Sequence, residues 1–140
     1  MNSKLNRFIE AQEQIYTQAL TEIKSGKKQS HWMWYIFPQI KGLGHSSTSQ
    51  FYGINNIVEA KEYLIHPILG ARLREISNVL HESDKSDAFE IFGSPDYMKL
   101  KSSMTLFAIA TDEENNVFKK VLNKFFNSSY DRRTLELLGI

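Results

Sequence analysis

The segment LNRFIEAQEQIYTQALTEI, residues 5–23, indicates what kind of fold the chain adopts. Its apolar residues recur every three or four positions, which is the spacing of one face of an α-helix. Gly26 follows at a distance suited to ending that helix. No part of the chain alternates apolar and polar residues as a half-buried strand does, and no internal repeat occurs. We therefore expect one amphipathic helix over residues 5–23 and an all-helical fold.

Capping residues and prolines divide the rest of the chain into further helices. Polar N-cap side chains and a proline in the first turn are typical helix starts, and the residue before a proline disfavours the helical conformation. Ser30 is the expected cap of a short helix that ends before Pro38. Ser94 and Pro95 mark the start of a helix over residues 98–110. Three further helix starts are indicated by Asn56, Pro67 and Asp131. The pattern predicts an all-α fold, a single compact multi-helix domain of six to eight helices spanning residues 1–140.

The composition argues against several classes of protein. A chain of 140 residues is long enough to bury the core of one domain. It has no cysteine, which disfavours a disulfide scaffold and makes the cytoplasm the expected location. A net charge of +1 gives no strong nucleic-acid signal. Residues 1–7 lead into an amphipathic pattern, so neither a signal peptide nor a membrane span is expected.

Residues 30–39, SHWMWYIFPQ, form an aromatic run that contains both tryptophans. Rings with polar tips at this density are typical either of a packed hub or of the wall of a pocket for a flat ligand. Trp32 and Trp34 point in different directions on a helix, so only one of them is expected to face a pocket. His31 is a candidate for proton transfer and Gln39 for reading an amide or base edge. Packing is the structural alternative for the rings and His31, and a turn contact for Gln39.

Residues 99–105, KLKSSMT, form a second candidate binding element. Serine and threonine are poor helix formers, so three hydroxyls inside a predicted helix indicate either a functional site or hydrogen bonding between helices. Ammonium groups and hydroxyls suit an anionic ligand, and the ligand-binding candidates are Lys99, Lys101, Ser102, Ser103 and Thr105. Asp96 is a second candidate for proton transfer, although a carboxylate in the first turn of a helix is favoured by the helix dipole alone.

Two other groups of polar residues carry weaker signals. The four histidines have no spacing that places them with carboxylates on one helical face, so no metal site is predicted. No cofactor is expected either. Lys24, Lys27 and Lys28 lie close together near a predicted helix end, where cations complement the helix dipole. Capping and solubility explain them, with a phosphate site as the alternative.

Several blocks of the sequence resemble one bacterial family over nearly the whole chain. The blocks are residues 30–39, residues 66–73 (HPILGARL), residues 91–96 (IFGSPD) and residues 99–107 (KLKSSMTLF). They are similar to the domain-of-unknown-function 1810 family, which is often mislabelled calpastatin. The resemblance implies a mainly helical fold and supplies no activity or catalytic residues. The calpastatin label does not suit this chain, because that inhibitor is disordered and this composition is that of a packed globule.

A shorter resemblance is to the helical superfamily that acts on ADP-ribose and related N-glycosides. It rests on residues 58–61, His66, Pro67 and Arg72, and on Asp96, Tyr97, Lys101 and Met104. The sequence has no Glu-His pair, which is the motif of that superfamily, so its N-glycosidase mechanism is not carried over. What this resemblance implies is a class of substrate, namely ADP-ribose and related molecules.

The leading hypothesis is a small-molecule protein that binds or hydrolyses a nucleotide-like or phosphosugar ligand. Its pocket would lie between the aromatic run and the Lys/Ser helix, with Trp32 or Trp34 stacking on a ring. Lys99 or Lys101 would offset the phosphate charge, and His31 or Asp96 would move a proton. Whether the protein is an enzyme stays open.

The alternative is a non-enzymatic protein-interaction or adaptor module in which the same rings form a hub. Convergence distinguishes the two hypotheses. In the first, His31, Gln39, Lys101 and Ser102 meet at a concave pocket, and in the second they are scattered.

Overall fold

Residues 3–140, which a computed structural model describes, fold into α-helices and contain no named strand. Met1 and Asn2, the start of the segment for which no signal peptide is expected, lie outside this range. The helices are η1 (Ser3–Leu5), α1 (Asn6–Glu13), α2 (Tyr16–Lys24), α3 (Met33–Ile36), α4 (Ser47–Phe51), α5 (Ile57–Ile65), α6 (Leu69–Glu82), α7 (Ala88–Phe92), α8 (Asp96–Ala110), α9 (Val117–Phe126) and α10 (Arg132–Leu138). The all-helical class is confirmed. Within the described residues there are ten α-helices, seven of them with seven or more residues, against the six to eight expected.

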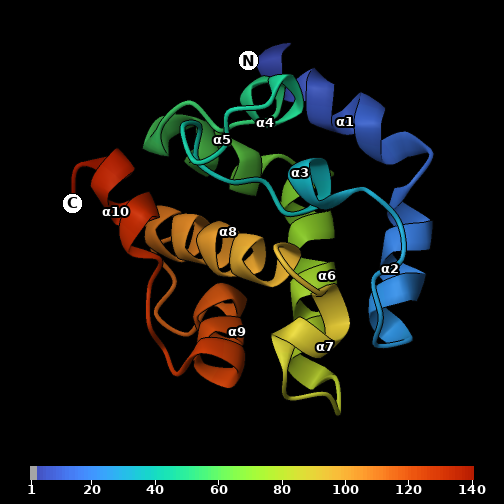
Figure 1. Cartoon of the computed structure of the whole chain (residues 1–140). Helices are drawn as coiled ribbons and strands as arrows, with labels where there is room; N and C mark the ends of the chain where they lie inside the picture. Colours follow the sequence, from blue (N-terminus) through green and yellow to red (C-terminus); the bar gives the residue numbers. More distant parts are fainter. Residues whose placement is uncertain (1–2) are drawn as a thin grey trace.

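The amphipathic segment over residues 5–23 forms two helices, so the prediction of a single helix is wrong. α1 ends at Glu13 and α2 begins at Tyr16. Ile15, between them, has a φ of −124° and lies outside the helical region. The two helices meet at an angle and both cover the core (Figure 1). Because each keeps its apolar face toward the same core, the helical spacing continues through the bend and does not reveal it.

The capping signals had mixed outcomes. Asn56 and Asp131 each accept a hydrogen bond from a backbone N–H in the first turn, of α5 and α10 respectively, so these caps are confirmed. Gly26, with a φ of +82°, follows the end of α2 as expected. Ser30 does not cap α3, because the helix begins after Trp32 and the Ser30 hydroxyl instead donates to Glu22 at 2.7 Å.

α8 is the central helix of the core. Nine of its fifteen residues are buried. It packs against α5, α7, α9 and α10, which surround it in Figure 1. Burial on all sides is typical of a core helix, and it explains why the amphipathic pattern is weak here. None of the helices described, of which α8 is the longest, has the length and hydrophobicity needed to cross a membrane.

Candidate ligand site at the start of α8

The two tryptophans of the aromatic run have different environments. Trp32 is fully buried, with its ring 6.1 Å from that of Phe37 and 6.5 Å from that of Phe92. Trp34, on α3, is half-buried, and the Lys99 ammonium lies 4.4 Å from the centre of its ring. The first tryptophan is therefore a core residue. The second is partly open to solvent.

Glu22, on α2, holds the loop that leads into α3. Its carboxylate accepts hydrogen bonds from the backbone N–H groups of Gln29 and Ser30 at 2.8 and 3.0 Å, and from the Trp32 indole at 2.9 Å. Burial alone would raise the pKa of Glu22, but these hydrogen bonds lower it by a larger amount. The pKa of Glu22 is therefore about 2. Glu22 was not among the residues predicted from the sequence. The available signal was its position three residues after Ala19, at the edge of the apolar face.

Asp96 joins two lysines, and each lysine lies against a tryptophan ring. The Asp96 carboxylate is 2.8 Å from Lys28 Nζ and 3.1 Å from Lys99 Nζ. Lys28 Nζ lies 4.9 Å from the centre of the Trp32 ring. We call Lys28, Trp34, Asp96 and Lys99 the Asp96 cluster. It brings residues 28–34 to the first turn of α8, and it carries one more positive than negative charge.

The protonation state of Asp96 follows from its neighbours. Burial raises the pKa of this carboxyl, whereas hydrogen bonds and charges from Lys28 and Lys99 lower it, and the lowering prevails. Asp96 is therefore ionised at neutral pH. In that state it accepts a proton and does not supply one.

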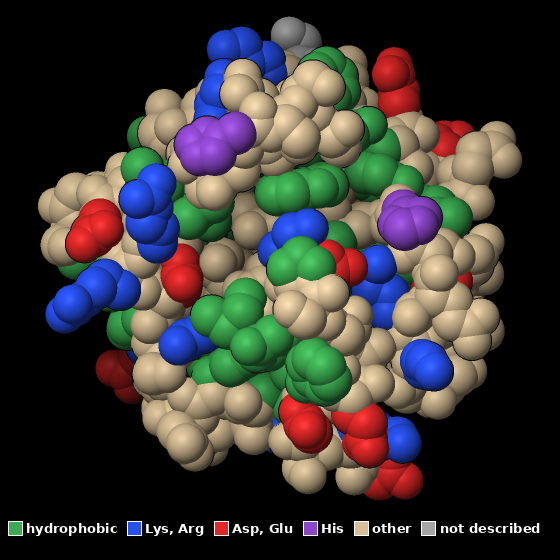
Figure 2. All heavy atoms as spheres, in the orientation of Figure 1, with side chains coloured by type: hydrophobic (Ala, Val, Ile, Leu, Met, Phe, Trp, Pro, Cys, Tyr) green, Lys and Arg blue, Asp and Glu red, His purple; other side chains and the backbone are tan. Residues whose placement is uncertain are grey.

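A pocket of about 370 Å³ adjoins the Asp96 cluster, because Lys28 belongs to both. Phe89, Phe92 and Gly93 also line it, and the Phe89 ring is 54% exposed. Its volume falls within the range of small-molecule sites. Figure 2 shows the face that carries α3 and the start of α8: oppositely charged side chains meet near its centre, and hydrophobic side chains gather below them.

None of the site residues predicted from the sequence lines this pocket. The His31 side chain is exposed, and Lys101 points to α9, with Nζ 5.9 Å from the centre of the Phe126 ring. Gln39 is only 3% exposed, and its Nε2 has no hydrogen-bond partner among the described residues. Ser102 is buried as well. The residues expected to meet at a pocket therefore do not meet at this one; they are His31, Gln39, Lys101 and Ser102.

The three hydroxyls of α8 have structural surroundings. Ser102 Oγ donates to the Met98 carbonyl at 3.2 Å, within the helix. Thr105 Oγ1 accepts the backbone N–H of Asp131 at 2.8 Å, which ties α8 to the start of α10. Ser103 Oγ is fully buried and has no partner within residues 3–140. Only the Thr105 contact is of the kind that the structural alternative predicts, a hydrogen bond between helices.

The part of the chain that the structure describes contains no group of three or more His, Asp or Glu side chains that could hold a metal ion.

Comparisons with known proteins identify the family. A search of curated proteins finds no match. Among solved structures, the chain is similar to the conserved hypothetical protein Rv1873 from Mycobacterium tuberculosis, with 45% sequence identity and a TM-score of 0.93. The match covers 97% of this chain and 96% of that protein. A family model, described as a protein of unknown function (DUF1810), matches residues 2–138. The resemblance to the domain-of-unknown-function 1810 family is thus confirmed, and the chain belongs to the DUF1810 family.

Proposed function

We propose that this protein binds a small anionic molecule with a flat ring, of the nucleotide-like or phosphosugar class, at the Asp96 cluster. The observation that carries the proposal is the pairing of Lys28 and Lys99 on one carboxylate beside the half-buried Trp34. A single carboxylate leaves one positive charge of the two lysines uncompensated. A phosphate group would be attracted to that charge, and its attached ring would find an aromatic face nearby.

The two lysines would have different tasks. Lys28 has a side chain that is only 7% exposed and also contacts the Ser30 carbonyl, so it is held in place. Lys99 has a side chain that is 23% exposed and lies over Trp34. It would turn toward the phosphate and free the indole face for the ring of the ligand. Lys28 supplies a fixed charge, and Lys99 supplies a movable one.

Asp96 is the group in the cluster that would take part in any hydrolysis. Its ionised carboxylate can accept a proton from a water molecule or from a hydroxyl of the ligand. Binding does not require this step. The two activities are therefore separable by experiment.

Calorimetry and thermal unfolding with ADP-ribose, AMP and ribose 5-phosphate test binding. A ligand of the folded state raises the melting temperature. We expect Lys99→Met to weaken binding about tenfold, as the loss of a charge-assisted hydrogen bond of about 1.5 kcal/mol implies. Lys101→Met is the matched control, since Lys101 lies on the same helix but over Phe126, and it should leave the affinity unchanged.

Asp96→Asn provides a test of opposite sign. Removing the negative charge should strengthen the binding of an anion and abolish any hydrolysis of it. If no compound binds the wild-type protein, the proposal fails and the protein-interaction hypothesis becomes the better one.

A further inference from the structure

A second pocket lies on another part of the molecule, beside Arg7. It has a volume of about 450 Å³ and lies between α1, the segment at Lys41, and the end of α4. The residues that line the pocket are Lys4, Arg7, Glu10, Lys41, Gln50, Phe51, Gly53 and Asn55. None of its lining residues belongs to the Asp96 cluster. We propose that this pocket is a separate binding site for a small anion, a phosphate or carboxylate attached to an apolar group.

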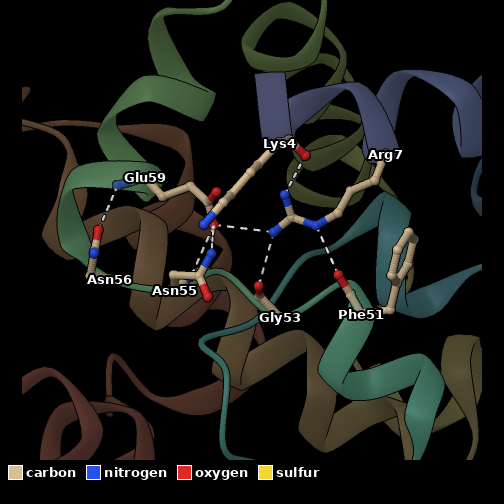
Figure 3. A network of polar contacts seen from close by, with 7 residues as sticks. All are labelled: Lys4, Arg7, Phe51, Gly53, Asn55, Asn56 and Glu59. Carbon is tan, nitrogen blue, oxygen red and sulfur yellow. Dashed lines mark hydrogen bonds and ion pairs between the residues drawn. The ribbon is translucent and has the colours of Figure 1, made fainter. Parts of the chain in front are cut away.

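Arg7 makes the wall of the pocket rigid (Figure 3). Its guanidinium donates from Nε to the Phe51 carbonyl at 2.8 Å and from Nη2 to the Gly53 carbonyl at 3.0 Å. Nη2 also pairs with Glu59 Oε1 at 3.1 Å, and Nη1 donates to the Lys4 carbonyl. Arg7 therefore joins α1, the end of α4 and α5. A wall held in this way is formed before a ligand arrives, which lowers the entropic cost of binding.

The position of Lys41 is fixed by a close approach between two backbone segments. Its backbone N–H donates to the Ile54 carbonyl at 2.8 Å. A Cβ atom added to Gly53 would lie 2.8 Å from Lys41 Cα, so the approach requires glycine. Lys41 is exposed. The backbone of Lys41 is thus held at the rim of the pocket, and its long, exposed side chain can reach a ligand.

The charges around the pocket favour an anion. Lys4, Arg7 and Lys41 line it, with Glu10 as the carboxylate among the lining residues. Glu59, behind the wall, accepts from Arg7, and in Figure 3 the Lys4 side chain points toward it as well. The lining residues and Glu59 together carry three positive and two negative charges. A net positive charge in a partly enclosed site attracts a phosphate or carboxylate.

Phe51 favours a ligand that has an apolar group in addition to its anionic group. Its side chain is 59% exposed, and its ring packs edge-on against Tyr52 with centroids 4.8 Å apart. An exposed aromatic ring at the rim of a charged pocket offers apolar contact to a molecule whose anionic group lies inside. Gln50 and Asn55 also line the pocket, and their amide groups donate to the His45 carbonyl and to Glu59 respectively.

The test is an NMR titration of the isotope-labelled protein, in phosphate-free buffer, with phenyl phosphate and with phenol. Phenyl phosphate should produce saturable shifts of the backbone amide signals of Phe51, Gly53 and Asn55, and phenol should not. Lys41→Met should weaken binding about tenfold, which corresponds to about 1.4 kcal/mol. Glu10→Gln should strengthen it. Lys61→Met, which changes an exposed lysine outside the pocket, is the control and should have no effect.

Three results would overturn the proposal. Equal shifts with phenol would show that the charge plays no part. Equal affinity of Lys41→Met and Lys61→Met would show that the site is not at this pocket. Shifts confined to residues 28–34 and the start of α8 would mean that phosphate binds only at the Asp96 cluster, so the outcomes for the two sites are distinguishable.

Discussion

The Trp32 indole N–H donates a hydrogen bond of 2.9 Å to Oε1 of Glu22, ten residues earlier in the chain. The same oxygen accepts the backbone N–H groups of Gln29 and Ser30. One buried carboxylate therefore fixes the path of the chain from α2 to α3. Lys28 and Trp34 belong to this connection, so the geometry of the Asp96 cluster depends on Glu22.

Replacing Glu22 by glutamine should destabilise the protein by about 2–4 kcal/mol, because an amide NH₂ cannot accept the hydrogen bonds that the lost oxygen accepted. Urea unfolding followed by tryptophan fluorescence measures the change. Glu13→Gln, an exposed change at the end of α1, is the control and should lie within about 0.5 kcal/mol of wild type. Equal stability of the two variants would contradict the role given to Glu22.

The stability should also depend on pH through Glu22. Its pKa is about 2 in the folded protein against an ordinary value of 4.5, so the unfolded chain takes up a proton first as the pH falls. The stabilisation, about 3 kcal/mol from a shift of this size, is thus fully present above pH 4.5 and is lost as the pH falls toward 2. Unfolding free energies measured between pH 7 and pH 2.5 should converge for wild type and Glu22→Gln. Parallel curves would contradict this assignment.

The hydroxyls of α8 should differ in their contributions. Thr105→Val leaves the Asp131 N–H without its acceptor and should cost about 1–3 kcal/mol. Ser103→Ala removes a buried hydroxyl that has no partner within residues 3–140, so stability should be unchanged or slightly higher. Urea unfolding of both variants tests the difference. A large loss in Ser103→Ala would contradict this assignment.

Gly70→Ala should be strongly destabilising, although alanine normally favours a helix. A Cβ atom at this position would lie 2.1 Å from the Leu64 carbonyl oxygen, which also accepts from Arg74 Nη1 at 2.9 Å. We expect a loss of about 3 kcal/mol or more from this overpacking. The neighbouring change Ala71→Gly, at an exposed position, should cost about 1 kcal/mol. Thermal unfolding of the two variants gives the comparison, and a smaller loss for Gly70→Ala would contradict the close approach of α5 and α6.

The helical class and several helix ends could be predicted from the sequence because they depend on local chemistry. Asn56 caps α5 through its own side chain, and this signal lies within four residues. The bend at Ile15 could not be predicted, because the apolar spacing is the same on both sides of it. The short helix ending before Pro38 was predicted and occurs as α3, but its start was wrongly placed after Ser30, because the ends of so short a helix depend on tertiary packing.

The candidate site could be predicted only in part. The sequence drew attention to Trp34, Asp96 and Lys99, which the structure brings together. Which tryptophan lies inside and where Lys101 points depend on tertiary packing, of Trp32 against Phe37 and Phe92 and of α9 against α8. Lys28 stood out only as one of three clustered lysines, with a phosphate site as the alternative to capping, and Arg7 carried no distinct signal. Their contacts with Asp96 and Glu59 join positions more than fifty residues apart.

Because α8 is buried, hydrogen exchange in this helix should report the unfolding of the whole molecule. Residues 102–108 are all shielded from solvent, so their amide protons should exchange with deuterium only when the entire protein opens. The exchange rates there report the free energy of global unfolding under native conditions. A ligand at either pocket should slow them all by the same factor, whichever end of the molecule it occupies.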